Sequence, residues 1–299
     1  MMKKTLKRVL TGLAAAMLAL AVLAAALAEF ATDKLYDNLI DLLFYTSNVT
    51  VKAKADFSLN GQWFKTADVV LRQDGSRSFR QMLLTSPKQD GTELKNGYTI
   101  VTDGNALYIM DVYAAGTYRS GMSGERNSLL RRSVEAESLA RLGGVLFSNA
   151  DLLLGKDVVA QAGDGEYRLH LGPDVPAAAN EILHQAARFA AKRYFGVDYD
   201  RINTENYNMH ASSFLTVTEG VVWTMKNLSV RNADLTAKTD GNGDLQSLDG
   251  KIVLSLETQA DGMKQLEIDL HLTVEDIFGT TVDPFDPNAY GVTEAGSLN

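Results

Sequence analysis

Apolar and polar residues alternate with a period of two along several stretches of this chain. In residues 48–59, polar side chains stand between Val49, Val51, Ala53, Ala55, Phe57 and Leu59. The same alternation runs through residues 264–276, where the apolar positions are Leu266, Ile268, Leu270, Leu272 and Val274. A period of two places successive side chains on opposite faces of a β-strand. These segments therefore predict strands with one buried face and one solvated face.

Tight-turn sequences follow the strand-like segments and predict antiparallel neighbours. Three such dipeptides are Asn60-Gly61, Asp74-Gly75 and Asp103-Gly104. Asn-Gly and Asp-Gly pairs favour hairpins because both residues tolerate a positive φ. The pattern predicts a meander of five antiparallel strands over residues 48–118. It also predicts a hairpin at 158–172 and further strands at 221–239, 251–258 and 264–276.

Three other segments carry apolar residues at helical spacing. They are residues 32–46, residues 126–155, and an alanine-rich segment that starts at Pro176 and runs to about residue 195. Helices and strands that are segregated along the chain, and do not alternate, indicate an α+β fold. An antiparallel sheet of about eight or more strands with one apolar face needs a cover. The predicted helices are the available cover.

The first 28 residues have the layout of a secretory signal peptide. The cationic segment MMKKTLKR precedes the uncharged residues 9–28, which end in Ala26-Leu27-Ala28. This order of charged, apolar and small residues predicts cleavage after Ala28. The alternative is an uncleaved N-terminal membrane anchor, because about 20 apolar residues can span a bilayer. The expected organisation is a signal peptide at 1–28, one domain at 29–285 and a flexible, proline-broken tail at 286–299. The expected location is extracytoplasmic, either secreted or in the periplasm or cell envelope.

Charge and cysteine content narrow the range of partners. The chain has a net charge of −8 and no cysteine, and loss of the four cations in residues 1–28 would leave −12. An acidic protein is a poor match for nucleic acid and for anionic lipid surfaces. We therefore expect no nucleic-acid partner and at most transient membrane contact. Without cysteine, disulfides, thiolate metal sites and cysteine nucleophiles are excluded, so the core must stabilise the exported domain.

A possible calcium loop lies in TDGNGDLQSLDG, residues 239–250, where three oxygen-bearing residues are spaced two apart: Asp240, Asn242 and Asp244. A loop of the EF-hand type needs glycine at its sixth position and glutamate at its twelfth. Counted from Asp240, these positions hold Leu245 and Lys251. The segment is therefore interpreted as a hairpin connection without a metal, with bends at Gly241, Gly243 and Gly250.

The sequence contains none of the common catalytic motifs. The G-x-S-x-G nucleophile elbow, the phosphate-binding G-x-x-x-x-G-K-[ST] and the zinc-binding H-E-x-x-H do not occur. The four histidines have no partner at metal-ligand spacing and are interpreted as solvated or structurally bonded imidazoles. A non-catalytic protein with no metal and no cofactor is predicted, since scattered carboxylates are the only feature in favour of an enzyme.

Candidate ligand contacts lie on the apolar face of the predicted sheet. Aromatic residues are concentrated in the first meander, where they either fill a core or line a groove for an apolar ligand. Period two places Trp63 on the same face as Ala67 and Val69. The alanine-rich helix is thin, so it either packs very close to the sheet or leaves space beneath it. The predicted cavity-lining residues are Phe57, Trp63, Val69, Leu71, Ile100, Ile109 and Leu183.

The order of elements resembles that of the LolA-like lipoprotein carriers. The resemblance rests on the helix after a signal peptide, the V-x-V-x-A-x-A-x-F strand at 49–57, the segment DGNALYIMDVYAAGTY and the final DLHLTVEDIFGTTVDP. Parts of the chain are also similar to exported clostridial proteins with no assigned activity. The resemblance implies a half-barrel, which is a strongly curved antiparallel sheet whose concave face is covered by helices and holds acyl chains or other lipid.

We therefore expect a protein that binds a lipid or another apolar small molecule between the sheet and its helices. The alternative is an interaction or sensing module of the cell envelope, with the same fold, a filled core and a protein partner. The two hypotheses differ in whether the apolar face leaves space for a ligand.

Overall fold

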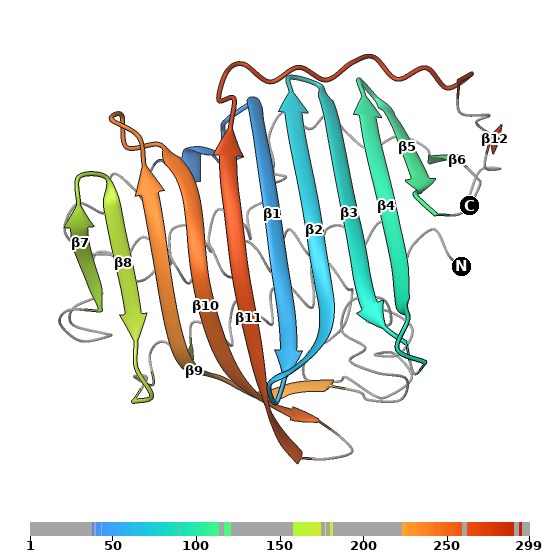
Figure 1. Ribbon diagram of the computed structural model, residues 1–299. Helices are drawn as coiled ribbons and strands as arrows, with labels where there is room; N and C mark the ends of the chain where they lie inside the picture. Colours follow the sequence, from blue (N-terminus) through green and yellow to red (C-terminus); the bar gives the residue numbers. More distant parts are fainter. Residues whose placement is uncertain are drawn as a thin grey trace.

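In the part of the chain that the structure describes, twelve strands form one open sheet (Figure 1), in the order β12-β6-β5-β4-β3-β2-β1-β11-β10-β9-β8-β7. The computed structural model describes residues 38, 40–42, 44–88, 90–113, 117–120, 158–174, 177, 180–181, 223–258, 262–289 and 293–294. The predicted signal peptide, the predicted helix at 126–155 and Leu183 lie outside these residues.

The strands confirm the predicted meander, hairpin and C-terminal strands. The first meander consists of β1 (Asn48–Leu59), β2 (Gln62–Asp74), β3 (Arg77–Pro87), β4 (Glu93–Asp103), β5 (Ala106–Asp111) and the additional β6 (Thr117–Ser120). The hairpin is β7 (Val159–Gly163) with β8 (Glu166–Leu171). The last third contains β9 (Trp223–Thr239), β10 (Leu245–Thr258) and β11 (Gly262–Glu275).

Neighbouring strands are antiparallel except at one edge. There, β12 (Thr293–Glu294), from the segment predicted to be a tail, runs parallel to β6. The two meanders join at the centre of the sheet, where Ala55 of β1 lies opposite Leu270 of β11. The sheet therefore continues across the junction between the first and last thirds of the chain.

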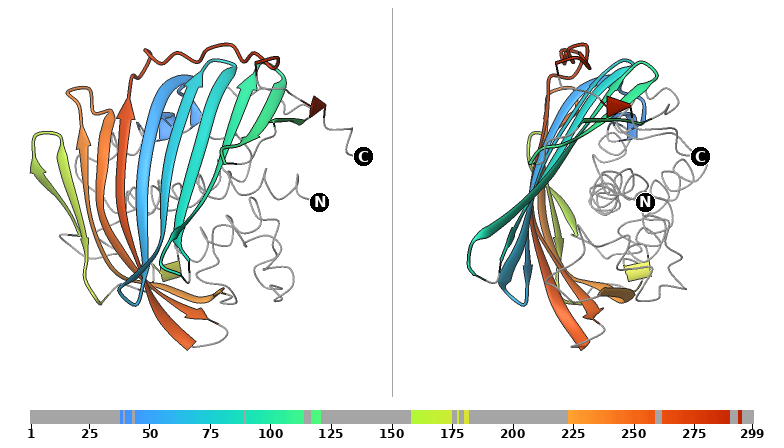
Figure 2. Two further views of the ribbon diagram at one scale, coloured as in Figure 1. Left: turned by 45° about the vertical axis from the view of Figure 1, so that its right-hand side comes forward. Right: turned by 90° about the vertical axis from the view of Figure 1, so that its right-hand side faces the viewer.

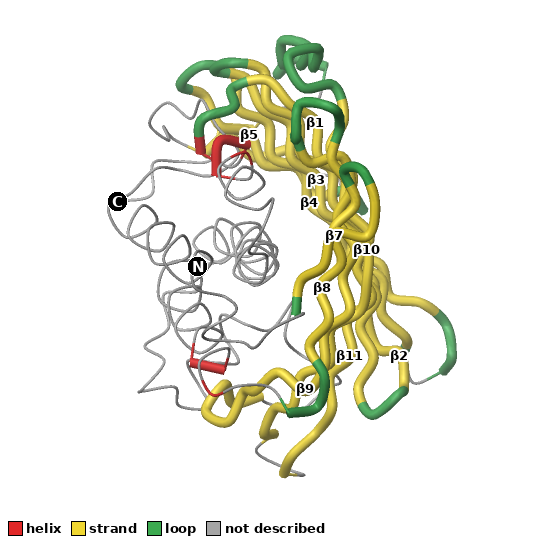
Figure 3. Tube along the Cα trace, turned by 90° about the vertical axis from the view of Figure 1, so that its left-hand side faces the viewer, coloured by secondary structure: helices red, strands yellow, loops and turns green. Residues whose placement is uncertain are grey.

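The sheet is strongly twisted and curved (Figures 2 and 3). Its two faces differ in chemistry. Val51 packs against Leu42, and the helical segment that carries Leu42 lies on the side on which the sheet is concave (Figure 3). Because alternate residues of a strand share a face, Ala53 and Ala55 lie on this concave side as well. The intervening Lys52 and Lys54 are exposed on the convex side. The alternation in sequence thus becomes an apolar concave face and a charged convex face.

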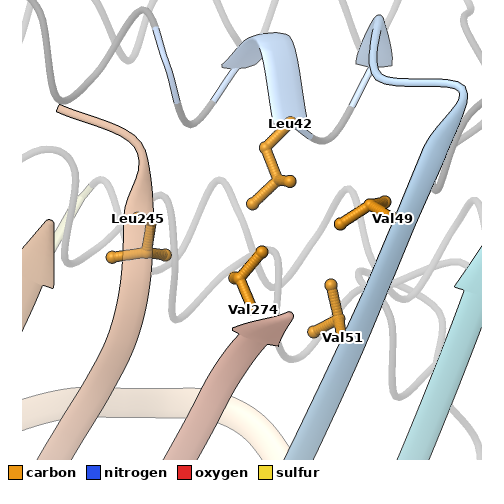
Figure 4. Close-up of a cluster of buried hydrophobic side chains, with 5 residues drawn as sticks. All are labelled: Leu42, Val49, Val51, Leu245 and Val274. Carbon is orange, nitrogen blue, oxygen red and sulfur yellow. The ribbon is translucent and has the colours of Figure 1, made fainter. Parts of the chain in front are cut away.

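A short helical segment packs on one end of the concave face. Residues 38, 40–42 and 44, within the predicted helix at 32–46, are helical. Leu42 from this segment meets apolar side chains of β1, β10 and β11 (Figure 4), namely Val49, Val51, Leu245 and Val274. The helical residues 180 and 181 also lie on the concave side (Figure 3).

The hairpin predicted at residues 239–250 is confirmed, but it is shorter than predicted. Asp240 Oδ1 accepts hydrogen bonds from the backbone nitrogens of Asn242 and Asp244, at 2.8 and 2.9 Å. The Asp240 carboxylate therefore closes the turn between β9 and β10. The placement of Gly250 at a bend was wrong, because this residue lies inside β10, between Leu235 and Leu270 on the neighbouring strands.

Close approach of two strands explains the glycine inside β10. Gly250 has a φ of 149°, and a Cβ atom added there would lie 2.0 Å from the Asp234 carbonyl oxygen. A strand-interior glycine of this kind allows a sharp local bend. Gly250 therefore allows the backbones of β9 and β10 to approach closely at this position.

The segment after β11 is held in place as a strap along the strand ends. The strap, residues 276–289, crosses the ends of β1, β2 and β4 (Figure 1). Its backbone nitrogens at Thr280, Val282 and Phe285 donate to side chains on those strands, at 2.7, 3.2 and 3.1 Å respectively. The acceptors are Asn48, Asp74 and Asp103. The polar, proline-broken composition of this segment therefore does not make it loose.

Replacement of Gly250 by alanine is expected to destabilise the fold by about 1–3 kcal/mol, because the added methyl group would overlap the backbone of β9. Gly241→Ala is the matched control, since a Cβ at that position would meet nothing within 4 Å. Urea unfolding of both variants measures the difference. Equal unfolding midpoints for the two variants would contradict the close approach of β9 and β10.

Candidate functional site

The concave face is the candidate site because it forms a continuous apolar surface. Strand pairing places buried apolar side chains from nine adjacent strands on this one face. In spatial order these strands are β8, β9, β10, β11, β1, β2, β3, β4 and β5. One residue from each strand, in spatial order, gives Leu169, Leu235, Ile252, Leu270, Ala55, Val69, Met82, Ile100 and Ile109. Burial of so much apolar area is the main favourable term in the stability of such a sheet.

Small side chains occupy the centre of this face. Ala55 of β1 and Ala67 of β2 lie opposite each other, and Ala53 pairs with Val69 in the next concave row. All three alanines are buried, with Ala67 only 1% exposed. Because alanine extends only one carbon from the backbone, whatever lies over this central strip approaches the sheet closely.

Five of the seven predicted cavity-lining residues are on the concave face. Phe57, Val69, Ile100 and Ile109 are buried there, and Leu71 packs beside the cluster that contains Val51. Leu183 is outside the described residues. The structure thus brings these five side chains to one surface, while their contact with a ligand stays a prediction.

The placement of Trp63 on this face was wrong. A β-bulge shifts the register of β1 and β2, so that Phe57 lies opposite Lys65 but Ser58 lies opposite Trp63. The extra residue is Phe64, whose buried ring lies 6.3 Å from the Phe57 ring. The bulge turns Trp63 to the convex side, where it is 37% exposed and its indole nitrogen donates to Thr66 at 3.0 Å.

A lysine beside the bulge lies on the apolar face. Lys65 is only 4% exposed and lies opposite Phe57. Burial lowers the pKa of its ammonium group from the usual 10.5 to about 8, because desolvation disfavours the charged form. Period two could have identified this residue, since Lys65 alternates with Ala67 and Val69, but a lysine in such a pattern is normally assigned to solvent.

A second polar group lies on the concave face near the opposite ends of β2, β3 and β4. Gln73, Ser78 and Thr102 form one row across the three strands, and each is at most 2% exposed. Gln73 Nε2 donates to the backbone oxygens of Gly75 and Arg77, at 2.6 and 3.1 Å. Arg80, one row further along β3, places a guanidinium nitrogen 3.5 Å from Gln73 Oε1.

The convex face carries solvated ion pairs. Hydrogen bonds join His170 to Asp234 and Lys251 to Glu267, and they lower the pKa of the Asp234 and Glu267 carboxyl groups. His170 and Asp234 are largely exposed, and Lys251 and Glu267 are partly exposed, so each pair adds little to stability. In the described ranges, no three acidic or histidine side chains gather as metal ligands would.

The helical segments that the structure describes include none long and apolar enough to cross a membrane.

No protein-family model matches the chain, and a comparison with curated proteins finds no match. Among solved structures, the chain is similar to a LolA superfamily protein from Nitrosomonas europaea, at 9% identity and a TM-score of 0.22, over 86% of this chain and 95% of that one. It is also similar to an N-terminal dehydratase from the difficidin assembly line, at 10% identity and a TM-score of 0.15, over 81% and 82% of the two chains. A dehydratase domain of PpsC from Mycobacterium tuberculosis gives 11% identity, a TM-score of 0.14 and coverages of 81% and 80%. Similarities with such TM-scores support no inference about function.

The buried lysine predicts a specific pH dependence of stability. The folded-state pKa of Lys65 is about 8 and the unfolded value about 10.5, so between these values the unfolded chain binds more protons than the folded chain. The free energy of unfolding should therefore rise with pH across this window, by at most roughly 3 kcal/mol.

Urea unfolding of the wild type and of Lys65→Met between pH 7 and pH 10.5 tests this effect. The difference in stability between the two proteins should shrink as pH rises, because only the wild type gains. Lys54→Met removes an exposed lysine from the convex face. It is the control for pH effects that arise from the loss of any lysine and do not depend on burial. Parallel pH profiles for wild type and Lys65→Met would show that the ammonium is not desolvated.

Proposed function

We propose that this chain is an exported, non-catalytic protein that binds an apolar or lipidic ligand against the concave face of its sheet. The observation that supports this function best is the contrast between the two faces. The concave face is apolar across nine adjacent strands, whereas the convex face carries lysines, carboxylates and histidines. Ligand sites for apolar molecules are concave surfaces of this kind, with few polar groups among many apolar ones.

The small side chains at the centre of the concave face form the proposed ligand-binding strip. Ala53, Ala55 and Ala67 leave the sheet surface low there, between the larger Phe57 and Met82 side chains. The proposed architecture is a half-barrel in which helices cover the concave face and an apolar ligand lies between the helices and the alanine strip. In this arrangement the ligand completes the cover of the sheet.

Export and the lack of catalysis are part of the same proposal. Residues 1–28 have the charge and hydropathy pattern of a signal peptide. A non-catalytic role is proposed because the sequence has no catalytic motif, and because the described acid–base pairs lie on the exposed convex face, where no site excludes water.

An added side chain in the alanine strip should distinguish a ligand site from a filled core. We expect the neutral fluorescent probe N-phenyl-1-naphthylamine to bind the wild type. The substitution Ala67→Leu should weaken binding by about tenfold or more, because the added atoms occupy ligand space. The unfolding midpoint should change little, because the proposed arrangement places a ligand, and not protein, over this strip.

Thr85→Leu is the matched control, because it adds a leucine to the next strand on the convex face. This variant should bind the probe as the wild type does. Failure of the wild type to bind the probe, together with a loss of about 1–3 kcal/mol of stability in Ala67→Leu from overpacking, would favour a filled core and contradict the proposed function.

A further inference from the structure

A buried hydroxyl group on the concave face lacks a partner. In the described part of the chain, Ser78 Oγ is buried and forms no hydrogen bond. The residue is 1% exposed and lies on the concave face, opposite Gln73 on one side and Thr102 on the other. An unsatisfied buried hydroxyl costs free energy, so a group that bonds to it on ligand binding would gain the bond without breaking another.

A guanidinium group lies on the same face, one row away from this hydroxyl. Arg80 follows Ser78 by two positions on β3, so both side chains project from the same face, roughly 7 Å apart along the strand. The contact of Arg80 with Gln73 Oε1, at 3.5 Å, draws the guanidinium group toward the row that contains Ser78. Gln73 is itself held by its two bonds to backbone oxygens, so it is a fixed support for the arginine.

We propose that Ser78 and Arg80 form a subsite for the oxyanion head of an amphiphilic ligand, either a carboxylate or a phosphate on an acyl chain. This inference rests on the proposed function and specifies its ligand class. Arginine presents a planar fork of N–H donors that matches both oxyanions, and the serine hydroxyl adds a donor from the same side. Inside an apolar surface such charge-assisted bonds are stronger than in water.

The apolar surface beyond the subsite has the length of an acyl chain. From Leu71, the partner of Arg80, β2 continues past Val69 and Ala67 to Lys65. This distance is roughly 20 Å at about 3.3 Å per residue. One leaflet of a bilayer has a hydrocarbon thickness of about 15 Å, so an extended acyl chain fits along the strip with its head at Arg80.

Lys65 is the competing anchor at the other end of the strip, and its surroundings make it the weaker one. It lies opposite Phe57 and next to Phe64, at a bulge that is buried on the concave face. No row of buried polar side chains accompanies it among the described positions, in contrast to the row of Gln73, Ser78 and Thr102. Ser78 and Arg80 offer two donor groups on one face, whereas Lys65 offers one charged group.

Calorimetric titration of the delipidated full chain with dodecanoate, dodecyl phosphate and dodecanol tests this subsite. The three probes share one chain and differ in the head. We expect the wild type to bind at least one anion about tenfold or more tightly than the alcohol. Arg80→Gln should remove this preference and Ser78→Ala should reduce it, while both variants keep the affinity for dodecanol. The anion with the larger preference identifies the head as carboxylate or phosphate.

Two further variants separate the subsite from general charge effects. Arg72→Gln makes the same substitution at a neighbouring position of β2 on the convex face, and it should leave the preference unchanged. Ser78→Ala should unfold at the same or a higher urea concentration, because it removes an unsatisfied hydroxyl. A lower midpoint would assign Ser78 a structural role and overturn the inference.

The remaining outcomes are also decisive. Equal affinity for the alcohol and both anions would overturn the subsite and leave the proposed function standing. If Lys65→Met lost the preference for anionic probes and Arg80→Gln kept it, the ligand head would bind at the Lys65 end of the strip. This result would overturn the assignment of the subsite to Ser78 and Arg80. Binding of none of the three probes would contradict the proposed function itself, and the subsite with it.

Discussion

An antiparallel sheet with one apolar face must keep that face away from water, and this constraint governs the rest of the structure. Each buried valine, leucine or isoleucine on the concave face contributes about 1.5–3 kcal/mol relative to its exposed state. An open sheet cannot enclose its apolar face as a closed barrel does. Curvature of the sheet and covering segments must therefore shield this face from water together. The helical turn that carries Leu42 and the strap at 276–289 meet this need at different places on the sheet.

Hydrogen bonds from the strap to polar side chains at the strand ends help to hold the covering segments on the sheet. Asn48, Asp74 and Asp103 stand at strand ends, where backbone ladders stop and side chains are free to accept from another segment. The Phe285 ring then lies 4.2 Å from the Tyr108 ring, between ring centroids. The chain after β11 is therefore fixed to the first meander, and this contact links the last third of the sequence to β4 and β5.

Period-two alternation predicted which strands form and which way most side chains point, because alternation is a direct consequence of strand geometry. It failed at Trp63 because one extra residue in β2 inverts the faces beyond the bulge, and a bulge has no reliable local signature. It failed at Gly250 because the close approach of β9 arises from pairing, which local sequence does not encode. Lys65, Ser78 and Arg80 stood at concave positions in the pattern, but charge and polarity alone assign such residues to solvent. The burial of Lys65 and Ser78 depends on the neighbouring strands.

The polar residues on the concave face make the two ends of its apolar strip chemically different. Lys65 and the group formed by Gln73, Ser78 and Arg80 lie at opposite ends of an apolar strip. The two ends of the strip therefore differ in the polar groups that they offer, a single lysine at one end and an amide, a hydroxyl and a guanidinium group at the other.

Native mass spectrometry of the full chain, purified from a bacterial host without detergent, tests the central claim most directly. The account predicts an added mass that disappears on solvent extraction and is identified as a lipid or another apolar molecule. A clean protein mass, unchanged after incubation with fatty acids and phospholipids, would contradict it.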